Sequence, residues 1–387
     1  MFIIHEGHVF CQTTNTANNP DSVEISLLTC KPRPYIYSLY GHTAIRYQDK
    51  RHGVDLVVNY GTFSFDKPFF ILRFVLGLTD YEMGIENFED FKYQYAKDGC
   101  GVIEQTLNLS PEEKNKIASA LGNNYKPENR VYRYNYFYDN CTTRARDIIV
   151  NNVEENVVYT NKTQHSYPSY RQLIHKYNET HRWARFGNDL LLGVKADLAT
   201  SYEQQQFLPD NLCEDFDKTY LKDIHNKGRR LVKEKKWLMP PSGNSVDETF
   251  PLTPRDCMLI LACIIIATTI LEIKKSKVFW QLDIFIMLMT GLCGLILFTM
   301  VFSQHPTVSL NFQILLLNPL NIIFLWPTTR SLKKGEASLW LKVWTVLIII
   351  FLLGGILQDY AEGLYLVALS LLFRNIFTIR NLRAQRK

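Results

Sequence analysis

The sequence predicts an α+β domain followed by a domain of transmembrane helices. Residues 1–256 are polar and rich in aromatic side chains, and their short alternating segments are interspersed with helical ones. Residues 257–387 are dominated by long apolar runs. A third observation is a cysteine, Cys141, at the start of a predicted helix, which suits a thiol enzyme better than a structural scaffold.

We divide the chain into four segments. Residues 1–21 are interpreted as the remnant of an export signal or a disordered start, because they contain part of an apolar run but no basic beginning. Residues 22–238 form the expected catalytic domain. Residues 239–256 contain four prolines and are the expected linker. Residues 257–387 form the expected transmembrane domain.

The elements of the first domain follow from side-chain alternation and from helix-start signals. Ser110 followed by Pro111 and two glutamates predicts a helix that ends where Gly122 and two asparagines begin. Residues 161–236 are expected to be mostly helical. The predicted strands are 22–31, 39–47, 55–63 and 132–136, and the main predicted helices are 111–121, 142–150 and those starting near 169 and 209.

Cys141 is the strongest candidate for a nucleophile. Asp139 or Asn140 can cap the helix that follows, which places Cys141 in its first turn. The unpaired N–H groups and the positive end of the helix dipole favour a thiolate there. Arg144 adds positive charge nearby. For the other seven cysteines the sequence has no CxxC pair and no zinc spacing, although Cys30 and Cys100 could pair in an oxidising compartment.

His42 is the candidate base for this thiol. It lies in a predicted strand with Ala44 and Arg46 on the same face. The next strand offers two polar residues, Asn59 and Asp55, either of which could orient the imidazole. The expected set is therefore Cys141, His42 and, with Asn59 preferred, an orienting residue.

Two further segments allow two interpretations each. The short apolar segment 69–77 is either a core helix or a lipid-facing surface. The basic run 227–236 is either the solvated face of a helix or a contact for anionic lipid, and we favour the solvated face. The net charge of +5 is mild, and its basic residues form no stripe that would suit nucleic acid. The sequence indicates no metal and no cofactor.

Five apolar runs predict five membrane helices, and the charges beside them predict their orientation. The loops after the first and third runs and the chain end are rich in Lys and Arg, whereas the connections 303–311 and 358–359 contain none. The positive-inside rule then places the C-terminus in the cytoplasm and the first domain outside it. The runs are 257–273, 278–302, 312–327, 338–357 and 360–377.

Polar residues gather at the outer end of these runs. His305 lies in an uncharged outer loop, and Asn318 lies inside the third run. Polar groups within a membrane are functional candidates, although hydrogen bonding between helices explains them equally well. Asp283 lies near the cytoplasmic end of the second run, where a structural role is the better interpretation.

Three motifs together resemble the Lnb-type lipoprotein N-acyltransferases of bacteria. They are Tyr40-Gly41-His42-Thr43-Ala44-Ile45-Arg46, Asn59-Tyr60-Gly61-Thr62-Phe63 and Asp139-Asn140-Cys141-Thr142-Thr143-Arg144. The resemblance implies an exported thiol-enzyme domain of the papain-like, NlpC/P60 and LRAT-like class, followed by membrane helices in the inner membrane. It implies Cys141 as nucleophile and His42 as base. Asn140, Arg144, Tyr40, His305 and Asn318 are the candidate substrate-binding residues.

Three functions are compatible with these residues. The resemblance favours transfer of a fatty acyl group through a Cys141 thioester to the N-terminal amine of a lipoprotein, with a phospholipid or another lipoprotein as donor. The alternative enzyme is a membrane-anchored thiol peptidase or amidase with water as acceptor. In the third interpretation Cys141 is an inert core thiol in a membrane scaffold. The polar cluster at the outer leaflet favours the acyltransferase.

Overall fold

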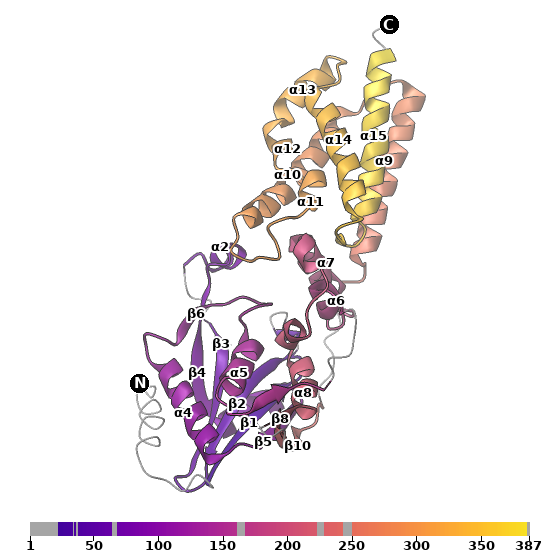
Figure 1. Cartoon of the computed structure of the whole chain (residues 1–387). Helices are drawn as coiled ribbons and strands as arrows, with labels where there is room; N and C mark the ends of the chain where they lie inside the picture. Colours follow the sequence, from indigo (N-terminus) through magenta and orange to yellow (C-terminus); the bar gives the residue numbers. More distant parts are fainter. Residues whose placement is uncertain are drawn as a thin grey trace. The chain divides into compact units, whose positions relative to one another are not determined.

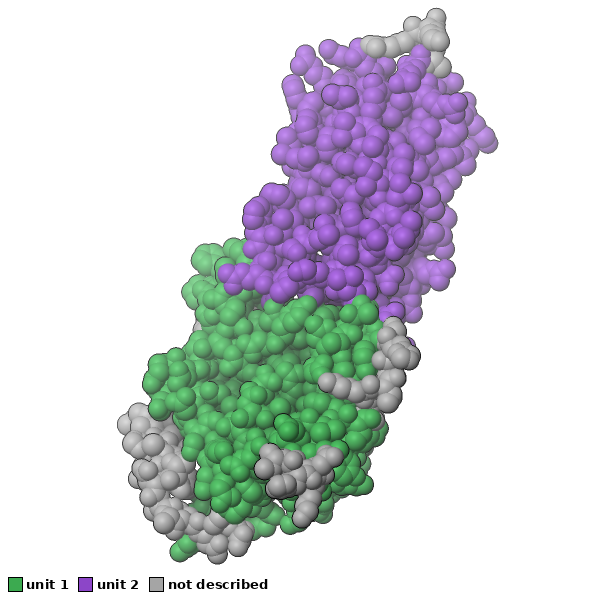
Figure 2. All heavy atoms as spheres, in the orientation of Figure 1, with its two compact units in different colours: residues 1–170, 199–246 green, residues 171–198, 247–387 purple. Residues whose placement is uncertain are grey.

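The computed structural model describes residues 22–33, 35, 38–63, 68–160, 167–222, 228–242 and 250–384. The expectation for residues 1–21 therefore lies outside the described residues. The chain divides into two compact units (Figures 1 and 2). Unit 1 contains residues 1–170 and 199–246, and unit 2 contains residues 171–198 and 247–387. Residues 171–198 thus leave the first unit, fold with the second and return.

Unit 1 is built on a seven-stranded antiparallel sheet in the order β10-β5-β1-β2-β3-β4-β6. Its strands are β1 (Val23–Cys30), β2 (His42–Asp49), β3 (Val54–Thr62), β4 (Asp80–Asn87), β5 (Val102–Leu107), β6 (Val131–Arg133) and β10 (Val232–Met239). A second, three-stranded sheet consists of β7 (Asn156–Val158), β8 (Tyr220–Lys222) and β9 (Gly228–Arg230).

Both faces of the large sheet are covered. Figure 1 shows α4 and α5 along one face, where residues such as Leu27, Ile45 and Val58 form the larger core. Their neighbours Leu28, Ala44 and Val57 point to the other face and pack with α3. The helices of unit 1 are α2 (Phe70–Val75), α3 (Phe88–Lys97), α4 (Pro111–Tyr125), α5 (Cys141–Val150), the 3-10 helix η4 (Glu203–Phe207) and α8 (Pro209–Asp217).

The predicted strands at 22–31, 39–47 and 55–63 and the helix start at Ser110 are confirmed. Three expectations were wrong in detail. The strand expected at 132–136 ends at Arg133, and the helix expected to stop at Gly122 continues to Tyr125. Residues 161–236 are less helical than expected, because β8, β9 and most of β10 lie there.

The described basic residues of the run 227–236 lie in strands, 228–230 in β9 and 232–236 in β10, and not on a helix face. Residues 232–239 form β10, which pairs with β5 at the edge of the large sheet. Lys235 pairs with Asp217, and Lys236 lies 3.5 Å from the Glu104 carboxylate. Lysines on an edge strand discourage pairing with another chain, which is a physical reason for this composition.

Unit 2 contains the apolar runs. Its elements are α7 (Arg182–Leu191), η3 (Val194–Ala196), α9 (Pro254–Lys275), α10 (Trp280–Val301), α11 (Gln313–Leu316), α12 (Leu320–Ile323), α13 (Leu325–Lys333), α14 (Leu339–Gly354) and α15 (Leu364–Ala384), and α6 (Tyr170–His175) begins one residue before it. Among the described residues, α9 and α10 are long and apolar enough to cross a membrane, and α14 is a shorter apolar helix.

The third apolar run is not one continuous helix. It divides into α11, α12 and α13, with a break at Asn318 and Pro319. Proline cannot donate a hydrogen bond to a preceding turn, so the chain restarts there. The Asn318 side chain accepts from the Leu320 N–H at 3.0 Å. Asn321 bonds Thr290 and Trp340 on the neighbouring helices α10 and α14. Backbone that is not helical is therefore supported by buried polar side chains.

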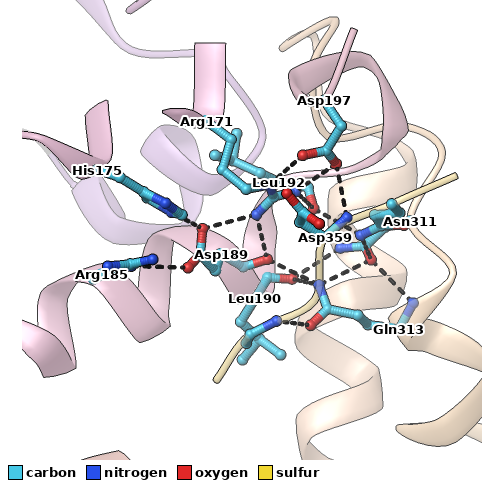
Figure 3. A network of polar contacts seen from close by, with 12 residues as sticks. Arg171, His175, Arg185, Asp189, Leu190, Leu192, Asp197, Asn311, Gln313 and Asp359 are labelled. Atoms are coloured by element: carbon cyan, nitrogen blue, oxygen red, sulfur yellow. Dashed lines mark hydrogen bonds and ion pairs between the residues drawn. The ribbon is translucent and has the colours of Figure 1, made fainter. Parts of the chain in front are cut away.

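A buried polar network fastens residues 171–198 to the rest of unit 2 (Figure 3). The Arg171 guanidinium is fully buried and pairs with Asp189 and Asp197. Gln313 donates to the Asp189 and Leu190 carbonyl oxygens. The two carboxylates neutralise the Arg171 charge inside the protein. The hydrogen bonds of Gln313 join α7 to the start of α11.

A second buried charge cluster lies among the membrane helices. Arg374 of α15 is fully buried and bonds Glu272 of α9 at 2.9 Å and Asp283 of α10 at 2.7 Å. Three helices far apart in sequence are thus joined through one guanidinium. The structural role expected for Asp283 is consistent with this contact.

Gly193 is expected to tolerate no side chain. A Cβ there would lie 2.0 Å from the Leu310 carbonyl oxygen, in a stretch where Gly193 and Val194 donate to the Thr307 and Leu310 carbonyls. Gly193→Ala should therefore destabilise unit 2 by about 1–3 kcal/mol, because the two backbones must separate. Gly187→Ala is the matched control, since a Cβ there meets nothing within 4 Å. Thermal unfolding of the detergent-solubilised protein should show a lower Tm only for Gly193→Ala, and equal Tm values would contradict the close packing.

Candidate active site

Asn140 fixes the start of the helix that carries Cys141. Its side-chain oxygen accepts from the N–H groups of Thr142 and Thr143, both at 2.9 Å, and its amide donates to the Tyr136 and Phe207 carbonyls. Of the two caps considered, Asn140 is thus the one used. Both atoms of this amide are engaged inside the protein. Cys141 is consequently held in the first turn of α5, where the helix dipole favours an anion.

Cys141 at the start of α5 and His42 at the start of β2 lie close enough for each to shift the pKa of the other. Burial by itself raises the pKa of the Cys141 thiol, but the charge of His42 and hydrogen bonds from His42, the Thr43 backbone N–H and Thr142 lower that pKa below the ordinary thiol value. Burial lowers the pKa of His42, and the Cys141 charge and hydrogen bond together with Asn59 raise it above its usual value. Both directions favour a thiolate–imidazolium pair.

Asn59 is the residue that orients His42. Its Oδ1 lies 2.9 Å from His42 Nε2, and its Nδ2 donates to Glu86 Oε1 at 2.7 Å. Because Nδ2 is used for Glu86, Oδ1 must accept from a protonated Nε2, and His42 Nδ1 is left to face the sulfur. The other candidate, Asp55, instead pairs with Arg46 at 2.6 Å.

Glu86 and Gln94 extend this chain and were missed by the sequence reasoning. Gln94 of α3 donates to Glu86 Oε2 at 2.8 Å, so both carboxylate oxygens of Glu86 are occupied. Burial raises the pKa of Glu86, while the hydrogen bond from Asn59 opposes that rise. Only the pairing register of β3 and β4 could have pointed to Glu86. In that register Glu86 lies opposite Val57 and faces the same side of the sheet as Asn59.

The remaining candidates in unit 1 surround the cysteine without reaching it directly. Arg144 forms a bidentate pair with Asp139 at 2.6 and 2.8 Å and lies 3.4 Å over the ring of Tyr132. Tyr40 packs edge-on against Tyr136, with ring centroids 5.2 Å apart. Arg144 thus supports the loop before α5, and its charge is already compensated by Asp139.

An aromatic wall stands beside the sulfur. Tyr81 stacks on Tyr134 with centroids 4.3 Å apart, and Phe63 lies 5.0 Å from Tyr81. A Cβ on Gly61 would be 3.4 Å from the Tyr134 ring and 4.0 Å from Cys141 Cβ. These packed rings leave little room beside Cys141, which is itself buried.

The predicted residues of the membrane part, His305 and Asn318, belong to unit 2. His305 is half-buried in the turn after α10, where its backbone N–H donates to Ser303. Asn318 is buried and accepts a hydrogen bond from the Leu320 N–H at the start of α12. Cys30 and Cys100 are both free thiols, so the possible disulfide is not formed. The structure therefore brings Cys141, His42 and Asn59 together, with His305 and Asn318 in the other unit.

The paired thiol should react at a pH where ordinary thiols do not. We expect iodoacetamide to modify Cys141 at a lower pH than an ordinary thiol, because its lowered pKa provides thiolate there, and the rate should fall as acid takes the pH below that pKa. His42→Ala removes the largest influence that lowers the Cys141 pKa and leaves burial less opposed, so the reaction should shift to more alkaline pH. Peptide mass analysis after timed labelling gives the rate for each cysteine. A Cys141 rate that is unaffected by His42→Ala would contradict the pairing.

The fold and the site define a membrane protein whose α+β domain carries a buried cysteine and asparagine with a half-buried histidine between them. Residues 10–177 match the model of the Lnb N-terminal periplasmic domain, and residues 245–386 match the model of the Lnb transmembrane domain. The chain therefore belongs to the Lnb family, as its motifs predicted, and is an inner-membrane protein with a periplasmic N-terminal domain. Searches among curated proteins and among solved structures found no match.

Proposed function

We propose that this protein is a lipoprotein N-acyltransferase that carries the acyl group on Cys141. The observation that carries the proposal is the placement of Cys141 in the first turn of α5, beside a His42 that Asn59 holds at 2.9 Å, inside a domain of the Lnb family. The directions of the Cys141 and His42 pKa shifts agree with this placement. Membership of this family supports a function in lipoprotein N-acylation. The finer chemistry below is derived from the site residues.

In the first half of the reaction the Cys141 thiolate attacks the ester carbonyl of an acyl lipid. The bond between the carbonyl carbon and the ester oxygen breaks, a thioester forms, and the leaving oxygen takes a proton from His42 Nδ1. The N-terminal end of α5 stabilises the negative charge that develops on the carbonyl oxygen. Asn59 and Glu86 act as positioning residues, because they reach the reaction only through the imidazole.

In the second half the amine of the lipoprotein cysteine attacks the thioester. The amine loses a proton to His42, the carbon–sulfur bond breaks, and the thiolate is restored with an amide as product. Water must stay away from the thioester, or the protein becomes a hydrolase. The aromatic wall of Phe63, Tyr81 and Tyr134 supports the acyl transfer for this reason.

The proposal gives the candidate substrate-binding residues two kinds of role, support of the site and contact with substrate. They are Asn140, Arg144, Tyr40, His305 and Asn318. Asn140 and Arg144 act indirectly, since their polar atoms hold α5 and the loop before it. Tyr40 contributes an apolar surface through its contact with Tyr136. His305 and Asn318 are proposed to meet the lipid part of the substrates from the membrane unit.

The deciding experiment is mass spectrometry of lipoprotein N-termini in cells with and without this protein. We expect an amide-linked acyl group only when the protein is present. Unacylated amines in both strains, together with new cleavage products of periplasmic peptides, would favour the alternative thiol peptidase or amidase.

We also propose that the C-terminus lies in the cytoplasm. The loop 274–277 and the end of α15 carry the Lys and Arg residues, while 303–311 carries none. A cysteine added after Lys387 should resist a membrane-impermeant maleimide in intact cells and react after lysis. Labelling of intact cells would reverse the proposed topology.

A further inference from the structure

The helix α2 and the residue before it form an apolar protrusion on unit 1. Phe69 is 79% exposed, Leu72 51% and Phe74 49%. We call these three residues the α2 tip. Isolated exposed apolar residues are normal on a protein surface, but three large ones within six positions concentrate exposed apolar surface in one short segment. The core interpretation of segment 69–77 was therefore wrong for these side chains.

The α2 tip presents apolar side chains in more than one direction. Leu72 and Phe74 lie two positions apart on α2 and so point to different sides of the helix, while Phe69 precedes the helix in a left-handed conformation. A helix that docks on a protein surface needs only one apolar face. Apolar side chains on several sides suit an element that is surrounded by an apolar medium.

The base of α2 is held firmly. Gly77 has a left-handed backbone, and the Leu78 N–H returns to the Arg73 carbonyl at 2.7 Å, which closes the helix end. Arg73 and Arg133 both bond Asp80 at the start of β4. Phe69 itself adopts a left-handed conformation with φ of 55°, which is costly for a bulky residue. Because the base of α2 is fixed by hydrogen bonds and Phe69 has a costly backbone conformation, the fold itself keeps the apolar side chains of the α2 tip exposed.

α2 leaves the sheet at the edge that carries the site. It connects the end of β3, three residues after Asn59, to the start of β4. β2 begins with His42 at that same edge, because β2 and β3 run antiparallel with Ala44 opposite Asn59. Phe63 at the root of this connection contacts Tyr81, which stacks on Tyr134 beside Cys141. The surroundings of the α2 tip are therefore adjacent to the sheet edge that carries His42 and Cys141.

The short connection between unit 1 and the first membrane helix indicates that the apolar surroundings of the α2 tip are lipid. Unit 1 ends at Val246, and the membrane helix α9 begins at Pro254. Eight residue steps span at most about 29 Å, so unit 1 is confined to the neighbourhood of the bilayer surface. An apolar protrusion at such a high local concentration of lipid inserts even when its intrinsic affinity is modest.

We propose that the α2 tip inserts into the periplasmic leaflet of the membrane and docks the site-bearing edge of unit 1 on the lipid surface. The partner is the acyl-chain region of the bilayer and not a second protein. This inference goes beyond the proposed chemistry, because it holds equally for an acyltransferase and for a hydrolase of membrane substrates.

Site-directed photocrosslinking of the full chain in native membranes tests this. p-Benzoylphenylalanine placed singly at Phe69, Leu72 or Phe74 should yield, after irradiation, intact-mass adducts of one phospholipid. Tyr93 of α3 is the control position, since its ring is 70% exposed but its helix starts from the opposite end of β4. It should give no lipid adduct. Absence of lipid at all three tip positions, or adducts to protein alone, overturns the proposal.

A triple variant separates docking from folding. In Phe69→Ser, Leu72→Ser, Phe74→Ser the rate of Cys141 alkylation in detergent should equal that of the wild type, while turnover of a substrate embedded in vesicles should fall several-fold. Equal turnover in vesicles would overturn the proposal. The two claims fail separately, since lipid adducts without lipoprotein N-acylation refute only the proposed function, and N-acylation without lipid adducts refutes only the docking.

Discussion

Replacing Cys141 with alanine is expected to abolish N-acylation, with a loss of rate on the order of 10⁴-fold or more, because the group that holds the acyl chain is gone. Wild-type protein incubated with phospholipid should gain the mass of one acyl group, and hydroxylamine should remove it. Cys141→Ala should gain no such mass. Intact-mass spectrometry before and after hydroxylamine measures both steps.

The controls for this experiment are other cysteines and the base. Cys263 is exposed on α9, so Cys263→Ala should keep the adduct and the activity. His42→Ala should form the adduct much more slowly, since burial alone raises the pKa of the thiol. An acyl adduct that persists in Cys141→Ala would place the nucleophile elsewhere and end the proposed scheme.

Replacing Arg374 with methionine is expected to cause the largest loss of stability in the membrane unit. The change leaves Glu272 and Asp283, which are 3% and 5% exposed, without their shared cation. Breaking a buried ion pair from one side costs about 3–5 kcal/mol, because an uncompensated charge remains inside. Thermal unfolding in detergent, followed by the monodisperse fraction, should show a markedly lower Tm.

Two further variants test this explanation. Arg383 lies on the exposed side of the same helix, so Arg383→Met should leave the Tm nearly unchanged. Adding Glu272→Gln and Asp283→Asn to Arg374→Met removes the buried negative charges and should restore part of the loss. If the triple variant is less stable than Arg374→Met alone, the charge argument is wrong.

The parts of the site that lie on regular elements could be predicted from the sequence. Cys141 at a helix start and Asn59 opposite the His42 strand follow from local periodicity and capping, which act over a few residues. Glu86 and Gln94 could not be found in this way. Their contact with Asn59 depends on the pairing of β3 with β4 and on the packing of α3, which are long-range features.

The sequence was also insufficient for the charged and polar residues of the membrane helices. From the sequence Arg374 is one of several basic residues near the end of the chain, yet its guanidinium is buried between two carboxylates on other helices. The third apolar run was expected to form one membrane helix, but Asn318 and Pro319 divide it into short helices. In both places the outcome depends on partners that only the packed bundle supplies.

The excursion of residues 171–198 into unit 2 affects how this protein can be dissected and how it can evolve. The polypeptide passes between the two units three times, so a protease cut in the linker before α9 severs only one of the three links. The released N-terminal piece would still carry Arg171 and α7, which are bonded to the membrane part through Gln313 and Gln358. A gene fusion with a single crossover at the linker would likewise separate α7 from its native partners. We therefore expect the two parts to be inherited as one block, with compensating changes on both sides of the linker.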